Sequence, residues 1–154
     1  MPGKIAERLS SLNITLPQLV APLANYVPFT ISGKTLYISG QLPVKDGAIV
    51  KGLPGDNMSV EEAAAAARLC AINIIAQANA ALGGNLDRIT RCLRLGGFVA
   101  STPGFFDHPK VINGASDLIV EVFGDAGKHA RAAVGVAALP LGAAVEVDAI
   151  FEFE

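Results

Sequence analysis

The end of the chain constrains the fold most, because residues 143–153 alternate between two kinds of side chain. One set is apolar and consists of Val145, Val147, Ala149, Phe151 and Phe153. The other set is mainly acidic and includes Glu146, Asp148, Glu152 and Glu154. Successive side chains of a strand point to opposite faces, so we expect a half-buried strand here, with its apolar face on a core.

A second strand is predicted just before it, at residues 131–138, where small and β-branched residues follow Arg131. Residues 139–142, which contain proline and glycine, are predicted to form a turn. If this turn closes a hairpin whose flanking residues pair, Arg131 and Glu146 lie on the same face of the sheet.

Two amphipathic helices are predicted in the middle of the chain. The first runs from Ser59 to about Leu82, and Ser59 with Glu62 has the spacing of a capping box. Gly83-Gly84 ends it, because glycine accepts the left-handed conformation that often follows a helix. The second helix covers residues 107–123. Apolar side chains recur in both at three- and four-residue spacing, which indicates one buried face on each helix.

The remaining segments complete an α+β pattern. We predict strands at 27–31, 35–39 and 88–100, a hairpin turn at 32–34, a weak helix at 3–12, an irregular stretch at 16–23 and a long loop at 40–58. Gly96-Gly97 inside the long strand suggests a bulge or a close backbone approach. The order β-β-α-β-α-β-β predicts a single domain, residues 1–154, with both main helices on one face of a mixed sheet.

Composition bears on partners and location. Apolar residues make up 51% of the chain and charged residues only 17%, whereas soluble domains carry about 25% charged residues. The excess apolar surface and the uncovered sheet face favour an oligomer. A net charge of -2 without a basic stripe makes nucleic acid an unlikely partner.

The N-terminus lacks the apolar stretch of a signal peptide and no segment suits a membrane span, so we expect a cytoplasmic protein.

The sequence lacks the familiar catalytic motifs, and its two cysteines, Cys70 and Cys92, lack the spacing of a metal or redox site. We expect two buried thiols. Arg131 is the residue that stands out, because small neighbours leave space beside its guanidinium, a good fork for a carboxylate. The alternative is a surface arginine balanced by nearby acidic groups.

Four segments resemble motifs of the Rid family, also called the YjgF or L-PSP endoribonuclease-like family. Residues 131–149 resemble its signature R-x-x-V-x-V-x-x-L-P-x-x-x-x-V-E-[IV]-[DE]-A, and residues 36–43 resemble I-x-S-G-Q-[IL]-P. Residues 25–29 and 111–113 are similar to its aromatic entry and to the V-N of its second helix. The resemblance spans about residues 20–154, which leaves an N-terminal extension of about 20 residues and suggests a longer subgroup.

This resemblance implies a chorismate-mutase-like fold and a homotrimer with clefts between subunits. It implies hydrolysis of 2-imino and 2-enamino acids, such as 2-aminoacrylate, to 2-keto acids and ammonia, with no metal and no cofactor. In that reading Arg131 binds the substrate carboxylate and Glu146 positions or activates water. The other residues carried over to the cleft are Tyr26, Ser39, Asn113 and Ala133.

Two further functions stay open at this point. The family's deaminases often have cysteine where this chain has Ala133, which gives weight to a non-catalytic trimer that binds a small carboxylate. The family's older name suggests an endoribonuclease, for which His129 could act on a phosphodiester. The acidic balance of the chain argues against that function, and His129 is then an ordinary loop residue.

Overall fold

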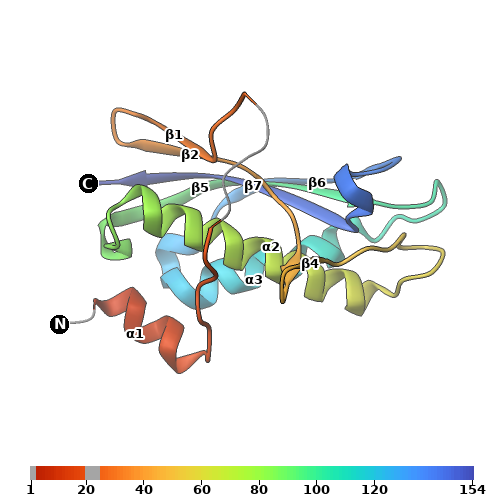
Figure 1. The fold of residues 1–154 in the computed structure, drawn as a ribbon, viewed down its shortest axis with the longest axis horizontal. Helices are drawn as coiled ribbons and strands as arrows, with labels where there is room; N and C mark the ends of the chain where they lie inside the picture. The colour runs from red at the N-terminus through yellow and green to blue at the C-terminus, as the bar shows by residue number, and fades with distance from the viewer. Residues whose placement is uncertain (1–2, 20–24) are drawn as a thin grey trace.

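The computed structural model describes residues 3–19 and 25–154 as a sheet covered by helices on one side. The helices are α1 (Lys4–Ser11), α2 (Val60–Ala81) and α3 (His108–Phe123), with short 3-10 turns η1 (Leu86–Arg88), η2 (Gly124–Gly127) and η3 (Pro140–Gly142). The strands are β1 (Phe29–Ser32), β2 (Thr35–Gln41), β3 (Val44–Lys45), β4 (Ala48–Ile49), β5 (Ile89–Ala100), β6 (Ala130–Val136) and β7 (Val145–Phe153). In Figure 1, α2 and α3 lie together below the sheet, with α1 farther out on the same side.

The main sheet has the strand order β1-β2-β7-β5-β6. All neighbours in it are antiparallel except β5 and β6, which are parallel and are joined by the crossover through α3. The α+β fold with two main helices on one face of a mixed sheet is therefore confirmed. The mixed sheet places β7, the strand with the clearest alternation, between two neighbours, where its apolar face is fully buried.

The predicted hairpin between β6 and β7 is wrong. β7 pairs with β2 and β5, whereas β6 pairs only with β5 and forms an edge of the sheet. Arg131 aligns with Leu95 of β5, which is buried under the helices, and Glu146 aligns with Phe98. Because residues three apart on a strand point to opposite faces, Arg131 and Glu146 lie on opposite faces of the sheet, and the same-face prediction is also wrong.

The core lies between the sheet and the two long helices. Its largest fully buried side chains include Leu36, Ile74, Ile75, Leu95, Ile112, Leu118, Ile119 and Phe151. The capping box is confirmed: Ser59 Oγ accepts a hydrogen bond from the Glu62 amide at 3.1 Å, and Glu62 Oε1 accepts one from the Ser59 amide at 3.2 Å. This cap fixes where α2 begins and so where its alanine-rich face meets α3.

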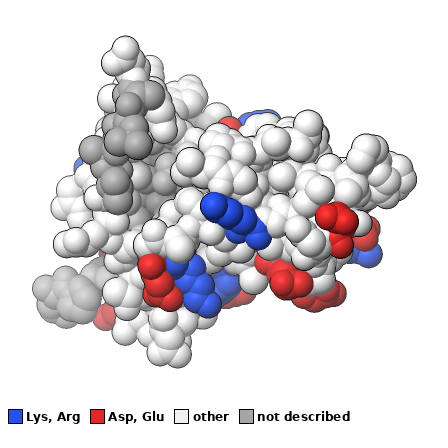
Figure 2. Space-filling model, turned by 45° about the vertical axis from the view of Figure 1, so that its right-hand side comes forward, with Lys and Arg blue, Asp and Glu red and all other residues white. Residues whose placement is uncertain are grey.

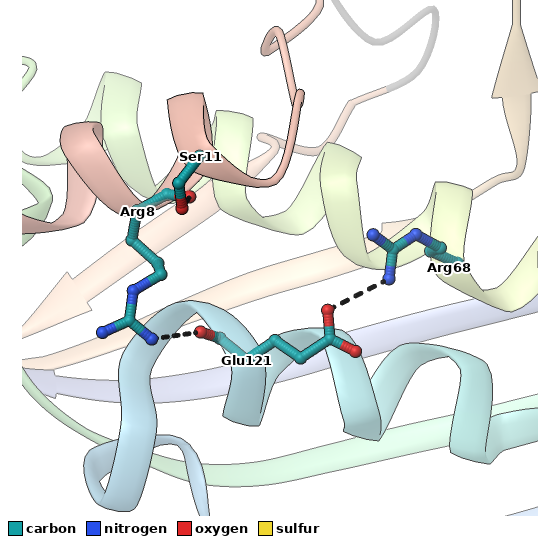
Figure 3. A network of polar contacts seen from close by, with 4 residues as sticks. All are labelled: Arg8, Ser11, Arg68 and Glu121. Atoms are coloured by element: carbon teal, nitrogen blue, oxygen red, sulfur yellow. Dashed lines mark hydrogen bonds and ion pairs between the residues drawn. The ribbon is translucent and has the colours of Figure 1, made fainter.

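A polar network joins all three helices on the side away from the sheet. Arg8 of α1 donates a 3.0 Å hydrogen bond from Nη1 to the carbonyl of Glu121 in α3 (Figure 3). The carboxylate of Glu121 forms an ion pair with Arg68 of α2 at 3.6 Å. The predicted N-terminal helix is confirmed, and these contacts attach it to α3.

Smaller differences from the sequence predictions have local causes. The predicted loop at 40–58 contains the hairpin of β3 and β4, which turns at Asp46 and Gly47, both with positive φ. Gly97 lies at a close approach and not at a bulge, because a Cβ there would overlap Ile112. The irregular stretch at 16–23 and the strand start at Val27 are only partly testable, since residues 20–24 lie outside the described residues and β1 begins at Phe29.

We predict that Gly114→Ala destabilises the protein. A Cβ on Gly114 would overlap the backbone carbonyl of Ala64, where α3 crosses α2, and backbone cannot move aside as a side chain can. The expected loss is about 1–3 kcal/mol in the free energy of unfolding, measured in urea, despite the better helix propensity of alanine. The control is Gly104→Ala, where the new methyl group meets no atom within 4 Å. Equal stability of the two variants would contradict this account of the helix contact.

Candidate functional site

Arg131 is held against α3 by three hydrogen bonds. Its Nη1 donates to Asn113 Oδ1 at 2.8 Å and to Ser116 Oγ at 3.1 Å, and its Nη2 donates to the Pro109 carbonyl at 3.2 Å. The three acceptors follow one another at four- and three-residue spacing, so they share one face of the helix. The parallel pairing of β5 and β6 brings this face beside the start of β6.

A second set of hydrogen bonds fixes Ser116 in turn. His129 Nδ1 lies 2.6 Å from the Gly127 carbonyl, and its Nε2 lies 2.8 Å from Ser116 Oγ. A carbonyl can only accept, so Nδ1 carries a proton. In the tautomer with its single proton on Nδ1, Nε2 accepts from the Ser116 hydroxyl. The hydroxyl can then accept from Arg131, and the chain of bonds runs unbroken from Gly127 to the guanidinium.

Arg131 has no acidic partner among the residues that the structure describes. The ion pairs found there are Arg68–Glu121, Arg94–Asp148, Lys110–Asp107 and Lys128–Asp125. All three acceptors on Arg131 are neutral oxygens. The guanidinium is thus positioned by hydrogen bonds while its charge stays uncompensated, which does not fit a surface arginine balanced by nearby acids.

Tyr26 and Ser39 lie together at a different place. Both line a cavity between β2, the N-terminal segment at 17–19 and α2. Ser39 Oγ donates a 2.7 Å hydrogen bond to the Val27 carbonyl, and Tyr26 is 57% exposed. Ser39 therefore holds the chain segment that carries Tyr26 against β2.

Glu146 lies beside this second group. Its carboxylate is packed against Gly40, the residue after Ser39, because a Cβ on Gly40 would overlap it. Partial burial and, to a smaller extent, the neighbouring Asp148 raise the pKa of Glu146. Burial also raises the pKa of Asp148, although its 3.7 Å ion pair with Arg94 opposes the shift. Glu146 is thus a carboxylate adapted to take up a proton more readily than an exposed one.

The six predicted site residues therefore form two groups on one protomer. Arg131, Asn113 and Ala133 lie where β6 meets α3, with Ala133 on the helix-covered side of the strand, aligned with Gly97. Tyr26, Ser39 and Glu146 lie around Gly40. Sequence reasoning missed Ser116, which its three-residue spacing from Asn113 could have revealed, and it treated His129 as an ordinary loop residue.

The cysteines do not contribute a nucleophile. Cys70 and Cys92 are fully buried, and burial raises the pKa of Cys92 to about 12 and that of Cys70 well above its ordinary value. Both therefore stay protonated near neutral pH. Within residues 3–19 and 25–154, no three His, Cys, Asp or Glu side chains come together as a metal site.

Charges of both signs are mixed on the surface. Figure 2 shows acidic and basic side chains interspersed on the visible face, without a continuous basic stripe. Among the described residues, no helix has both the length and the apolar character needed to cross a bilayer.

The family model described as "YjgF/chorismate mutase-like, putative endoribonuclease" matches residues 6–152, so the chain belongs to this family. Protein TCP17 of Trypanosoma cruzi is 51% identical over 97% of this chain and 94% of its own. The solved structure of Atu1372, a protein of unknown function from Agrobacterium tumefaciens, is 56% identical, with a TM-score of 0.91 over 97% of this chain and 94% of its own. A "putative endoribonuclease" from Shewanella oneidensis is 37% identical, with a TM-score of 0.94 over 98% of this chain and 100% of its own.

Proposed function

We propose that this protein hydrolyses 2-imino and 2-enamino acids to 2-keto acids and ammonia. The observation that carries the proposal is the guanidinium of Arg131, which is fixed by neutral acceptors and lacks an acidic partner among the described residues. A cation held in this way is prepared for an anionic ligand, because its orientation is already fixed before the ligand binds.

The ligand group that fits is a carboxylate. A guanidinium has five N–H donors, and α3 takes three of them. The Nε–H and the second Nη2–H are left to form charge-assisted hydrogen bonds with two carboxylate oxygens. A 2-imino acid carries its carboxylate next to the C=N carbon, so this anchor would set the reacting carbon at a fixed distance from Arg131.

Glu146 is the group proposed to manage protons. An imine takes up a proton from solvent at its nitrogen, and an enamine takes one up at its C3 carbon, so both enter as the iminium ion. A water molecule attacks the C=N carbon and gives a proton to the Glu146 carboxylate, which leaves a carbinolamine. Glu146 then returns this proton to the nitrogen, the C–N bond breaks and ammonia leaves, and the hydroxyl releases its proton to solvent to give the keto acid. The raised pKa supports this role, because a pKa nearer to neutral pH makes the carboxyl group a better proton carrier than an ordinary glutamate.

The two groups of site residues act together only if two subunits meet. Arg131 and Glu146 lie on opposite faces of the sheet, so one protomer does not bring them onto one substrate. The face that carries Glu146 also exposes Tyr37 and Val134, each 45% exposed, which a second copy would cover. A homotrimer in which β6 of one subunit approaches the Gly40 region of the next therefore belongs to the proposal, with a small carboxylate metabolite as ligand.

The non-catalytic carboxylate binder is the second candidate. Ala133 supports it, since the thiol common in the family's deaminases is replaced by a methyl group. An endoribonuclease is less favoured, because both ring nitrogens of His129 already have partners in Ser116 and Gly127. Imines are hydrolytically labile, so correct positioning and proton transfer can suffice without the thiol.

We predict that Arg131→Lys weakens the binding of pyruvate, a product-like 2-keto acid, by about tenfold or more. Lysine keeps the charge but cannot form the bidentate fork. Isothermal titration calorimetry measures the dissociation constant. Arg68→Lys is the matched control, because Arg68 pairs with Glu121 on the helical side. Unchanged affinity in Arg131→Lys would rule out the carboxylate fork.

We also predict that Glu146→Gln lowers kcat with 2-aminoacrylate by about a hundredfold or less, with a smaller effect on pyruvate affinity. The base must be ionised and its pKa is raised, so the wild-type rate falls as the pH is lowered, beginning at a higher pH than for an ordinary glutamate. The rate of the Glu146→Gln variant should not show this fall at low pH. Glu152→Gln, on the same face of β7, is the control. A wild-type pH profile in Glu146→Gln would assign the proton transfer to another group.

A further inference from the structure

The cavity beside Tyr26 and Ser39 contains an unusual group of uncharged polar side chains. Its volume is about 220 Å³, whereas about 10–15 Å³ on this measure holds one water molecule. Among the described residues, the lining contains no Asp, Glu, Lys, Arg or His side chain. Its polar side chains include the carboxamides of Gln18, Gln41, Asn73 and Gln77, and most of the other walls are apolar. We call this the amide pocket.

One of these carboxamides is not satisfied within the protein. Gln77 is only 5% exposed, and its Oε1 is buried without a hydrogen-bond partner among the described residues. Its Nε2 reaches Gln41 Oε1 at 3.5 Å, the outer limit of a hydrogen bond. A buried acceptor left unpaired destabilises a protein, so such an atom calls for an explanation.

Two of the other carboxamides bond to the backbone of the pocket wall. Asn73 donates a 2.8 Å hydrogen bond to the Leu42 carbonyl, which attaches this segment to α2, and Gln41 donates a 2.9 Å hydrogen bond to the Ser39 carbonyl, within the segment itself. Gln77 is the one whose Oε1 is buried without a partner among the described residues. Its one contact is long, and the proposal below requires the carboxamide to turn its Oε1 toward the cavity that Gln77 lines.

The pocket meets the proposed reaction site at Gly40. Gly40 lines the pocket, and the Glu146 carboxylate packs against the same residue. Gly40, which has no side chain, thus lies between the two, and the proposal places the side chain of a substrate bound near Glu146 past Gly40 in this pocket. A charged side chain is disfavoured there, because no charged side chain of the described lining would compensate its charge.

We propose that the amide pocket selects substrates whose side chain is uncharged and donates a hydrogen bond to Gln77 Oε1, as carboxamide and hydroxyl groups do. This inference rests on the proposed deaminase function and identifies its substrate class. It makes Gln77 a specificity-determining residue, distinct from the residues assigned to carboxylate binding and proton transfer.

The first test is binding, and it does not depend on turnover. Butyramide and 2-pentanone have almost the same shape, but only butyramide has N–H donors. With wild-type protein, butyramide should shift the NMR signal of the Gln77 side-chain amide at lower concentration than 2-pentanone, by about tenfold for one hydrogen bond of ordinary strength. Equal responses to the two compounds, or none at Gln77, would overturn the pocket assignment.

The second test is selectivity with Gln77→Met, which keeps the length of the side chain and removes the acceptor. Imino acids are generated from glutamine and from methionine by an amino acid oxidase. The ratio of kcat/KM for the glutamine substrate to that for the methionine substrate should fall by about tenfold in Gln77→Met. Gln77→Leu serves the same purpose if Gln77→Met does not fold. An unchanged ratio would overturn the specificity role.

The stability of Gln77→Met separates ligand binding from a structural role. Without ligand, removal of the unpaired oxygen should leave Tm unchanged or raise it, whereas a structural glutamine would lower it. If butyramide binds at Gln77 but no imino acid is turned over, the deaminase proposal and the substrate class fail while the ligand pocket stands. If imino acids are turned over without selectivity, only the present inference fails.

Discussion

The packing of α3 against the parallel strands β5 and β6 determines the geometry of the candidate site. The crossover places one face of the helix beside the first residues of β6, so that Pro109, Asn113 and Ser116 all reach the guanidinium of Arg131. Close contact is possible because glycines stand where larger side chains would overlap, Gly97 under Ile112 and Gly114 against Ala64. The close packing of α3 on β5 and β6 therefore determines the position of Arg131.

A second consequence of the same topology is that the site is divided. β7 lies between β2 and β5, so its acidic residues face away from the helices while Arg131 faces toward them. A cation and a carboxylate of complementary chemistry then stand on opposite faces of one sheet. The proposed trimer would bring the two together, since it would add the Arg131 edge of one subunit to the Glu146 face of another and cover Tyr37 and Val134.

Local features were predictable from the sequence because local interactions determine them. The capping box at Ser59, the hairpin turn at Gly33 and the alternation of β7 each depend on residues a few positions apart. The order of the strands was not predictable in the same way. A short turn at 139–142 suggests a hairpin, but β7 lies in the middle of the sheet between β2 and β5, where its apolar face is buried. The proximity of His129 and Ser116 to Arg131 and the unpaired oxygen of Gln77 depend on distant segments, which no local pattern reveals.

The most direct test of the central claim is to restore activity by mixing two inactive variants. Arg131→Met removes the carboxylate anchor and Glu146→Gln removes the proposed base. If each site takes Arg131 from one subunit and Glu146 from the next, random trimers from an equal mixture contain intact sites in about a quarter of positions. The account predicts recovery to about a quarter of wild-type turnover of 2-aminoacrylate after the variants are unfolded and refolded together. Turnover that stays at the level of the separate variants, while native mass spectrometry shows mixed trimers, would contradict a site shared between subunits.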